Sequence, residues 1–305
     1  MVMNLLGTLP KVSVCVITFN QERYIRQCLQ GIMDQNTNFD FEVIVGDDNS
    51  TDGTREVVID FANRYPDKII PLLYPNKVGG TQNFMEVHNR ASGTYVAHID
   101  GDDIALPGKL QAQADYLDAH PDCTLVWHRM ELFNDNETLC KPNLPDVSMF
   151  EGGKVLLTDA LKFGSVAYHS SLMYRASARK TRKVEGDTLD YYYTVEVLMS
   201  GYGKYLEGVL GRYRYNLNTG ISKKGRGSKF VMKVYAEHLG HYLSLFPEFR
   251  RDIFVNSLIY LLVELKNRRM SAFFFLILVI RSFSFVSPGK FISYLKQFRR
   301  INAGI

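Results

Sequence analysis

The sequence predicts an α/β fold: a Rossmann-like, mostly parallel sheet with helices on both faces, followed by a helical C-terminal region. Short apolar runs alternate with segments of helical periodicity over residues 10–130, as in consecutive βαβ units. Three of these runs end in polar or acidic side chains, where open α/β sheets bind ligands. From residue 229 onward the apolar spacing is helical throughout.

The first predicted strand covers residues 12–17, a nearly continuous apolar run that ends in Thr18-Phe19-Asn20. Such a run is typical of a strand buried on both faces of a parallel sheet. Apolar residues from Tyr24 to Ile32 then recur at helical spacing. The segment therefore begins with a strand, a polar strand end and a helix.

The same pattern repeats twice. Residues 41–46 form a second apolar run ending in Asp47-Asp48, and Thr51–Thr54 supplies N-cap residues for the next helix. We expect a third strand over 69–74 and a helix over 83–91. A fourth strand over 95–99 ends at Asp100. The further elements expected are a helix over 109–119, a strand over 124–127, a loop over 134–150, a helix over 156–163, a strand over 170–174, a helix over 189–200 and a strand over 205–214.

The bulk composition is that of an ordinary globular protein, with 46% hydrophobic and 22% charged residues among 305. This excludes disorder over most of the chain. The four cysteines show no metal-binding spacing, and the N-terminal residues lack the features of a signal peptide, so we expect reduced thiols and the cytosol. These cysteines are Cys15, Cys28, Cys123 and Cys140.

The net charge of +4 conceals an asymmetry. After Glu264 the chain carries eight basic residues and no acidic one, whereas the preceding part has a net charge of −4. A basic tail on a mildly acidic body indicates a tethering surface.

The acidic turn Asp100-Gly101-Asp102-Asp103 is the most informative motif. Carboxylates packed at a strand end repel one another, and a divalent cation among them removes that repulsion. Hard oxygen ligands suit Mg²⁺ or Mn²⁺ together with substrate phosphates. The alternative is a simple turn that caps the following helix, since Asp-Gly is a common turn dipeptide.

Three ordered blocks resemble the family-2 glycosyltransferases, which are inverting enzymes with the GT-A fold. The blocks are VSVCVITFNQERYIRQCLQGIMDQ, FEVIVGDDNSTDGT and GTYVAHIDGDDIALPGKLQAQADYLDAHPD, and a weaker match covers residues 185–222. The resemblance implies a GT-A domain over 1–222, with a nucleotide-binding half over 10–130 and an acceptor half over 131–222. A helical region over 223–305 follows.

The resemblance assigns the nucleotide pocket to the first two strand ends. Phe19 would stack on the base or pack under the loop, while Thr18 and the backbone of Ile17 would hydrogen-bond the nucleotide. Glu22 would either bind the nucleotide or cap its helix. Asp48 would accept from the ring N–H of uracil, and Asp47 would fix the loop.

On the diphosphate side the resemblance places Gly79, Gly80 and Asn83, with Lys77 as a source of positive charge. A plain turn is the alternative there. In the acidic turn it makes Asp102 the main metal ligand, with Asp100 on the ribose or in the metal shell and Gly101 between them. Asp103 would hydrogen-bond the loop or face the acceptor.

Inversion also requires a group that takes the proton of the attacking hydroxyl. The family has an acid ahead of a helix, which corresponds here to Asp187, with Asp190 and Glu185 as the other candidates. Asp187 could instead cap that helix. Arg214 matches a Tyr-Arg element and would contact diphosphate or pair with a carboxylate. Asn216 stands where the family often has a metal-binding histidine.

The segment 272–280 is apolar but too short to cross a bilayer. It is either a core helix or an interfacial helix, and the basic residues of 266–300 favour contact with an anionic membrane surface. Nothing upstream supports nucleic-acid binding.

The predicted function is inverting, metal-assisted transfer of a sugar from a nucleotide-sugar, a UDP-hexose or UDP-HexNAc, to a glycan or lipid-linked glycan. The resemblance suggests bacterial polysaccharide synthesis at the cytoplasmic face of the inner membrane. The alternatives are a nucleotidyltransferase that makes nucleotide-sugars and a non-catalytic binding protein of the same fold.

Overall fold

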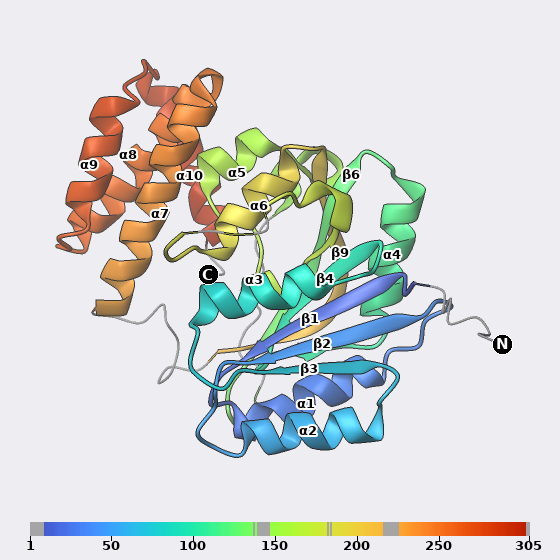
Figure 1. Cartoon of the computed structure of the whole chain (residues 1–305). Helices are drawn as coiled ribbons and strands as arrows, with labels where there is room; N and C mark the ends of the chain where they lie inside the picture. The colour runs from blue at the N-terminus through green and yellow to red at the C-terminus, as the bar shows by residue number, and fades with distance from the viewer. Residues whose placement is uncertain are drawn as a thin grey trace.

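The computed structural model describes residues 9–136, 138, 147–181, 183, 185–215 and 226–302. It shows a sheet covered by helices on both faces, with a helical C-terminal region beside it (Figure 1). The strands are β1 (Val12–Thr18), β2 (Phe41–Asp47), β3 (Ile69–Leu73), β4 (Tyr95–Asp100), β5 (Ile104–Ala105), β6 (Cys123–Phe133), β7 (Lys154–Val155), β8 (Met173–Arg175) and β9 (Tyr202–Arg214).

The helices follow the strands in the predicted alternation. Those of the sheet region are α1 (Glu22–Met33), α2 (Thr54–Arg64), α3 (Gly80–Arg90), α4 (Lys109–Ala119), α5 (Leu157–Phe163) and α6 (Asp190–Leu198). The C-terminal helices are α7 (Arg226–Leu245), α8 (Arg250–Lys266), α9 (Ala272–Arg281) and α10 (Pro288–Asn302). Short 3₁₀ turns include η3 (His169–Ser171), which precedes β8.

The sheet has nine strands in the order β3-β2-β1-β4-β8-β6-β9-β5, and β7 pairs with β9. Strands β3, β2, β1 and β4 are parallel, as predicted. The next strand, β8, is antiparallel to both β4 and β6. The sheet is therefore mixed rather than uniformly parallel, and the strand predicted over 124–127 lies beyond β8 and extends to Phe133.

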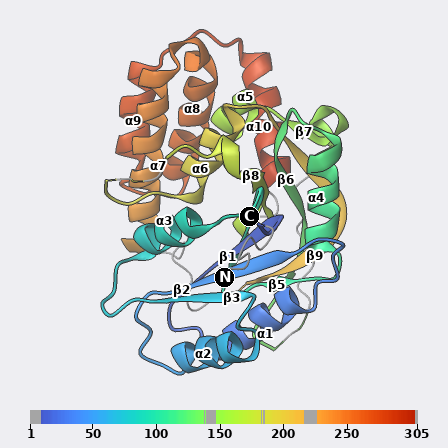
Figure 2. The same cartoon turned by 45° about the vertical axis from the view of Figure 1, so that its right-hand side comes forward.

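Alternation along the strands builds a core on each face of the sheet. Val12, Val14 and Val16 of β1 pack with the buried faces of α1, α2 and α4. Cys15 and Ile44 belong to the opposite core, which continues into α5, α6 and the C-terminal helices. Burial on both faces explains why the parallel strands read as nearly continuous apolar runs. Figure 2 shows α3 and α6 on one side of the sheet and α1 and α2 on the other.

Two expectations need correction, one in the middle of the chain and one at the start of α2. The strand expected over 170–174 begins only at Met173, because residues 169–171 form the 3₁₀ turn η3. Helix α2 begins at Thr54 with Gly53 as its N-cap residue, although the Asp52 carboxylate still accepts from the Thr54 N–H at 3.0 Å. The expectations for Cys140 and Asn216 lie outside the described residues.

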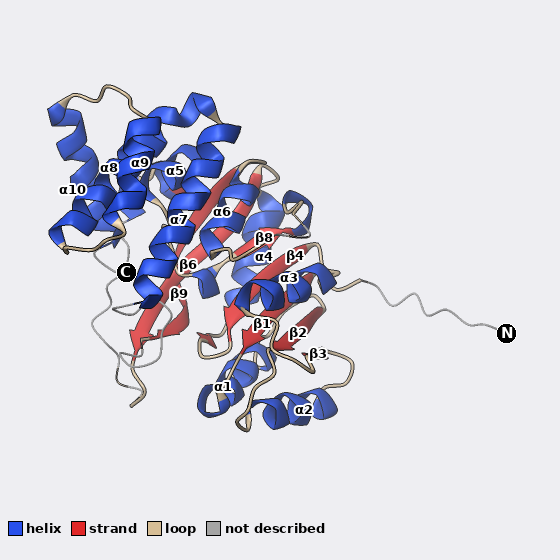
Figure 3. Ribbon diagram, turned by 60° about the vertical axis from the view of Figure 1, so that its left-hand side comes forward, coloured by secondary structure: helices blue, strands red, loops and turns tan. Residues whose placement is uncertain are grey.

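Helices α7–α10 form a bundle that packs against α5 (Figure 3). No helix in the described part of the chain is long and apolar enough to cross a membrane. Helix α9 packs one of its faces into the bundle, as expected for a core helix, and exposes apolar side chains on the other, while contact with a membrane stays a prediction. Phe275 and Leu278 are buried in the bundle, whereas Phe273 and Ile280 are 61% and 67% exposed.

Candidate active site

The candidate site lies at the carboxyl edge of the parallel strands. In the sheet register Thr18 stands opposite Asp47, and Ile17 stands opposite Asp100. The polar ends of β1, β2 and β4 therefore meet at one edge, which confirms that part of the sequence prediction. A ligand in the crevice beyond this edge would contact all three strand ends.

The acidic turn is fastened to the end of β1. The Gly101 N–H donates to the Ile17 carbonyl at 3.0 Å, and the Asp103 N–H donates to the Asp100 carbonyl at 3.0 Å. A Cβ at Gly101 would lie 2.5 Å from Oε1 of Gln21 and 2.9 Å from Cβ of Thr18. Only glycine allows this close approach, so Gly101 has a steric role in the turn. The Ile17 carbonyl already accepts a hydrogen bond from the Gly101 N–H.

The three carboxyls of the turn differ in their electrostatics. Burial and the charge of Asp100 raise the pKa of Asp102 to about 6. Burial, reinforced by Asp102 and Asp100, raises the pKa of Asp103 well above its usual value. Burial opposes ionisation of Asp100 too, but hydrogen bonds from His98 and the positive potential of His169 outweigh it, and its pKa lies below normal. The turn therefore concentrates negative charge that has few compensating partners.

Asp103 is a loop anchor. Its Oδ1 accepts from the Arg214 N–H at 2.8 Å, and its side chain is buried. The buried Lys109 lies on the same side, where Nζ contacts Nε2 of His128 at 3.0 Å. Burial lowers the pKa of Lys109 to about 7, partly offset by Asp103. Of the two roles expected for Asp103, the contact with the loop is observed.

The buried side chain of Arg214 supports the main chain of the acidic turn. Its Nε donates to the Asp102 carbonyl at 3.0 Å, and its guanidinium lies 4.2 Å from the Phe133 ring and 4.3 Å from the Tyr24 ring. One nitrogen is 3.8 Å from the Asp135 carboxylate. Of the two roles expected for Arg214, the structural one is seen, because its side chain is almost fully buried.

The first strand end exposes one aromatic ring. Phe19 is 37% exposed, and Nζ of Lys77 lies 3.4 Å from its ring centroid. Thr18 is buried and its Oγ1 donates to Oε1 of Gln21 at 2.8 Å. Phe19 and Lys77 are thus open to a ligand, whereas Thr18 is engaged within the protein.

Asp47 and Asp48 fix two different loops. Asp47 forms an ion pair with Arg55 at 2.8 Å, which agrees with its expected role. Oδ1 of Asp48 accepts from the Val78 N–H at 2.6 Å and from the Gly79 N–H at 3.1 Å. The carboxylate expected to face a uracil ring is here bound to the loop that precedes α3.

Gly79 and Asn83 lie on that loop and its helix. Gly79 has φ of 90°, a left-handed conformation that favours glycine, and a Cβ there would meet nothing within 4 Å. Asn83 is buried and its Nδ2 donates to the Gly46 carbonyl at 2.9 Å. Gly79 therefore leaves the loop open, whereas Asn83 fastens α3 to β2.

Glu22 does not cap its own helix, and its expected contact with the nucleotide stays a prediction. Its Oε2 accepts from the Gly53 N–H at 3.0 Å, at the start of the neighbouring helix α2. It joins the two loops at the carboxyl edge instead of capping its own helix.

On the opposite side of the acidic turn, α6 presents Asp190 as its first residue. Oδ2 of Asp190 lies 3.4 Å from Nδ1 of His169. Burial would raise the pKa of Asp190, but His169 outweighs it and the pKa is lowered, while the charge of Asp100 acts in the opposite sense. Asp187 and Glu185 are exposed on the preceding loop. Asp190 is thus linked to the acidic turn through His169, whose ring centroid lies 4.1 Å from that of His98, whereas the role of Asp187 stays a sequence prediction.

Sequence reasoning missed three residues of this site. His98 contacts Asp100 at 3.2 Å, Ser170 accepts from the Asp100 N–H at 3.0 Å, and His169 contacts Asp190. His98 could have been noticed as the one polar side chain inside the apolar run of the fourth strand. No signal marks His169 and Ser170, whose approach depends on how β8 is inserted.

The donor set available to a metal is small. Among the described residues no group of three or more histidine, cysteine, aspartate or glutamate side chains is arranged to hold an ion. Asp100 and Asp102 nevertheless offer adjacent, partly exposed carboxylates. These hard oxygens fit Mg²⁺ or Mn²⁺ when phosphate oxygens and water complete the shell.

The chain matches the model of Glycosyl transferase family 2 over residues 13–181. An uncharacterised protein of Mycobacterium tuberculosis is 40% identical over 126 residues, which are 41% of this chain and 36% of that protein. The chain thus matches about a third of the length of this relative.

Two solved structures share the fold. One is Staphylococcus aureus TarS 1-349 in complex with UDP-GlcNAc, with a TM-score of 0.57 and 19% identity over 97% of this chain and 84% of that one. The other is the mannosyltransferase PcManGT of Pyrobaculum calidifontis in complex with GDP-Man and Mn²⁺, with a TM-score of 0.55 and 15% identity over 97% and 86%.

Proposed function

The chain belongs to Glycosyl transferase family 2 and is a glycosyltransferase, and we propose that it transfers a hexose or N-acetylhexosamine from a UDP-sugar to a glycan hydroxyl with inversion. The observation that carries this proposal is the convergence of the strand ends at the carboxyl edge of β1, β2 and β4, where Thr18 pairs with Asp47 and Ile17 pairs with Asp100. That edge is the binding crevice of open α/β sheets.

For the donor, the proposal uses the exposed ring of Phe19 as the stacking surface for the base. Lys77 lies over that ring and would move onto a phosphate when the base replaces it. The open backbone at Gly79 allows close approach of the diphosphate. A structural neighbour with UDP-GlcNAc supports a uridine donor, and another with GDP-Man keeps a guanosine donor as an outcome of the test.

For the metal, we propose that Asp102 and Asp100 hold Mn²⁺ or Mg²⁺ with the donor diphosphate. When bound, the cation neutralises the charge that develops on the leaving diphosphate. The raised pKa of Asp102 supports this assignment, because a cation would offset both the burial of its carboxylate and the repulsion from Asp100 that raise it. Arg214 keeps the main chain of Asp102 in place through its hydrogen bond to the Asp102 carbonyl.

For the proton, the geometry favours Asp190 over Asp187 as the base. The acceptor oxygen attacks the anomeric carbon, its proton passes to the carboxylate, and the bond from that carbon to the diphosphate breaks. Asp190 lies beside the acidic turn and keeps a lowered pKa, so it is ionised at neutral pH. Asp187 is exposed and stays a sequence prediction.

For the acceptor, we propose a glycan carried on a lipid, with the protein peripheral on the cytoplasmic face of a bacterial inner membrane. The outer face of α9 exposes Phe273, Ile277 and Ile280. The segment from residue 265 to the end has eight basic residues and no acidic one. Anionic lipids suit an apolar face surrounded by basic groups.

The deciding experiment offers the purified chain UDP- and GDP-sugars with Mn²⁺ and a lipid-linked glycan pool, and measures nucleotide release and product mass. We expect release of UDP that requires both metal and acceptor. Release of pyrophosphate from a nucleoside triphosphate would instead identify a nucleotidyltransferase. Donor binding without turnover over a broad acceptor panel would identify a binding protein, and no binding at millimolar donor would refute the proposal.

A further inference from the structure

Four polar side chains form a row of hydrogen bonds that runs from the interior of the protein to the acidic turn. In order they are Tyr174, His88, His98 and Asp100. Oη of Tyr174 lies 2.8 Å from Nδ1 of His88, and Nε2 of His88 lies 3.0 Å from Nδ1 of His98. Nε2 of His98 then lies 3.2 Å from Oδ1 of Asp100. The two histidines and Tyr174 are buried, so the row connects the interior of the protein to a carboxylate that faces the crevice.

The row has one consistent direction. An ionised carboxylate only accepts, so Nε2 of His98 donates to Asp100. A neutral imidazole has one donor and one acceptor, so Nδ1 of His98 accepts from His88, and Nδ1 of His88 accepts from the Tyr174 hydroxyl. Both histidine rings are almost fully buried, and burial disfavours the charged imidazolium, which supports neutral rings. Each ring is thus held in its Nε2–H tautomer.

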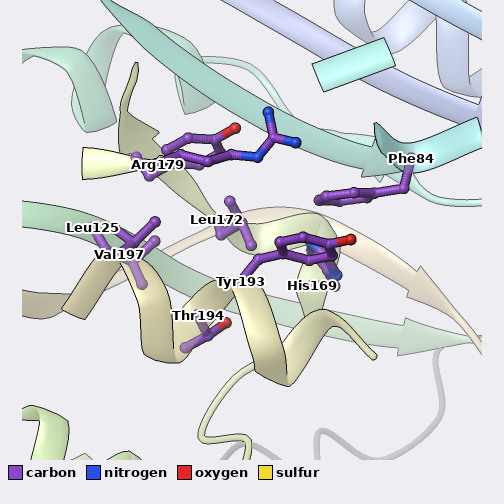
Figure 4. A pocket seen from close by; sticks show the side chains of 9 residues that line it. Phe84, Leu125, His169, Leu172, Arg179, Tyr193, Thr194 and Val197 are labelled. Carbon is purple, nitrogen blue, oxygen red and sulfur yellow. The ribbon is translucent and has the colours of Figure 1, made fainter. Parts of the chain in front are cut away.

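A third histidine, His169, connects this row to the other side of the crevice. The rings of His98 and His169 lie 4.1 Å apart, and His169 contacts Asp190 at 3.4 Å. Phe84 packs against His88 at 3.8 Å and against Tyr193 of α6 at 4.3 Å. Figure 4 shows Phe84, His169 and Tyr193 grouped at one end of a small apolar cavity. The packed rings leave the two histidines little freedom to turn.

From this geometry we infer that His98 and His169 are positioning residues, one for each carboxylate. His98 orients Asp100 toward the cation and donor, and His169 orients Asp190 toward the acceptor hydroxyl. The inference rests on the proposed function for the roles of Asp100 and Asp190. Hydrogen bonds from outer groups commonly change metal affinity by about 10- to 100-fold when they are removed.

Two pairs of variants separate the two roles in full-length protein. His98→Leu removes the donor to Asp100 and His98→Gln keeps an N–H near the same place, while His169→Leu and His169→Asn do the same for Asp190. We expect His98→Leu to raise the Mn²⁺ concentration for half-maximal UDP release by about tenfold or more. We expect His169→Leu to lower kcat by about tenfold without changing the Mn²⁺ concentration for half-maximal UDP release. The amide variants should remain within about threefold of the parent.

A matched control is His120→Leu, since His120 stacks on Tyr116 outside the site. The inference would be overturned if both leucine variants kept the parental kcat and the parental Mn²⁺ concentration for half-maximal UDP release. It would also be overturned if each variant changed both of these parameters. Amide variants no better than leucine ones would overturn it too.

The row itself is tested without activity, by long-range ¹H–¹⁵N spectra of the histidine rings in the parent protein. We expect His88 and His98 to show a protonated Nε2 and an unprotonated Nδ1. A proton on Nδ1 of His98 would overturn the positioning scheme. A parent protein that shows these tautomers but releases no nucleotide would refute the proposed function and leave the row standing.

Discussion

The guanidinium of Arg214 donates from Nε to the main-chain oxygen of Asp102 at 3.0 Å, over a separation of 112 residues. Its charge is held between the rings of Tyr24 and Phe133. Replacing it by glutamine leaves the turn unsupported and should lower the free energy of unfolding by about 2–4 kcal/mol. Urea denaturation measures this, and metal-dependent UDP release should fall in parallel.

Arg212 provides the matched control for Arg214. It lies two residues earlier on the same strand and pairs with Glu131 at 3.1 Å, but its side chain is 41% exposed. Exposed ion pairs contribute about 0–1 kcal/mol, so the free energy of unfolding of Arg212→Gln should be close to that of the parent protein. Equal losses in both variants would contradict the supporting role of Arg214.

The raised pKa of Asp102 predicts how stability depends on pH. Its folded pKa of about 6 exceeds the usual value of 3.8, so the folded metal-free protein binds the proton more tightly than the unfolded chain. Protonation of Asp102 therefore stabilises the folded protein most at pH values below the unfolded-state pKa of 3.8, and this stabilisation is lost as pH rises through the folded-state pKa of about 6. Asp102→Asn should stabilise the metal-free protein at pH 7.5, by about 1 kcal/mol after allowance for partial exposure, and much less at pH 4.

Thermal melting of both proteins at the two pH values, without metal, gives the difference directly. The comparison between variant and parent removes the opposing contribution of the buried histidines, which both proteins share. A destabilised Asp102→Asn protein at pH 7.5 would contradict the charge repulsion inferred at this turn. The same variant should lose metal-dependent turnover, because it has lost an ionised ligand.

Asp190 and Asp187 are three residues apart and make opposite predictions. Asp190→Asn should lower kcat by about a thousandfold with little change in donor affinity, because a general base contributes about 10²–10⁴-fold. Asp187→Asn should stay within about threefold, since its side chain is exposed before α6. Steady-state kinetics with donor and acceptor varied in turn decides. The reverse ranking would restore Asp187 as the base.

The Phe19 ring should contribute to binding of the nucleotide. Phe19→Ala removes the stacking surface, and we expect UDP affinity to fall by about tenfold, whereas Phe19→Tyr keeps it. Isothermal titration calorimetry with UDP and Mn²⁺ measures the change. Since Phe19 is partly exposed, both variants should melt near the parent temperature. Unchanged UDP affinity in Phe19→Ala would place the base elsewhere.

The outer face of α9 should bind anionic bilayers. The triple variant Phe273→Ser, Ile277→Ser and Ile280→Ser removes exposed apolar side chains without touching the buried Phe275. We expect at least a tenfold loss of sedimentation with vesicles that contain phosphatidylglycerol, and weak binding of the parent to neutral vesicles. Ile59→Ser on α2 is the control, because Ile59 is also exposed but lies outside the bundle. Equal parental binding to neutral vesicles would contradict the role of the basic residues.

The parallel half of the fold could be predicted because burial on both faces leaves an unmistakable pattern. Strands such as 12–18 are nearly all apolar, and clusters of polar side chains follow where the chain leaves the sheet. The site at the strand ends follows from that pattern and from parallel pairing. Helix α4, with its bounds at Lys109 and Ala119, was likewise predicted residue for residue.

The antiparallel insertion could not be predicted in the same way. Strand β8 has only three residues, and its place between β4 and β6 depends on long-range pairing rather than local propensity. The contacts of Ser170 and His169 with the acidic side chains depend on that insertion. The choice between Asp187 and Asp190 depends on where a helix begins, and patterns place helix ends poorly.

The support of the acidic turn by Arg214 also has a consequence for biosynthesis. A ribosome adds about 5–20 residues per second, so the turn leaves the exit site several seconds before its guanidinium partner, 112 residues later, is made. During that interval the nascent chain can complete the pairing of β1, β2, β3 and β4 but not the support of the turn. Support of the acidic turn is therefore among the last features to form during translation, and an mRNA truncated before β9 would encode a parallel half-sheet in which the Asp102 carbonyl and the Asp103 carboxylate lack their Arg214 partner.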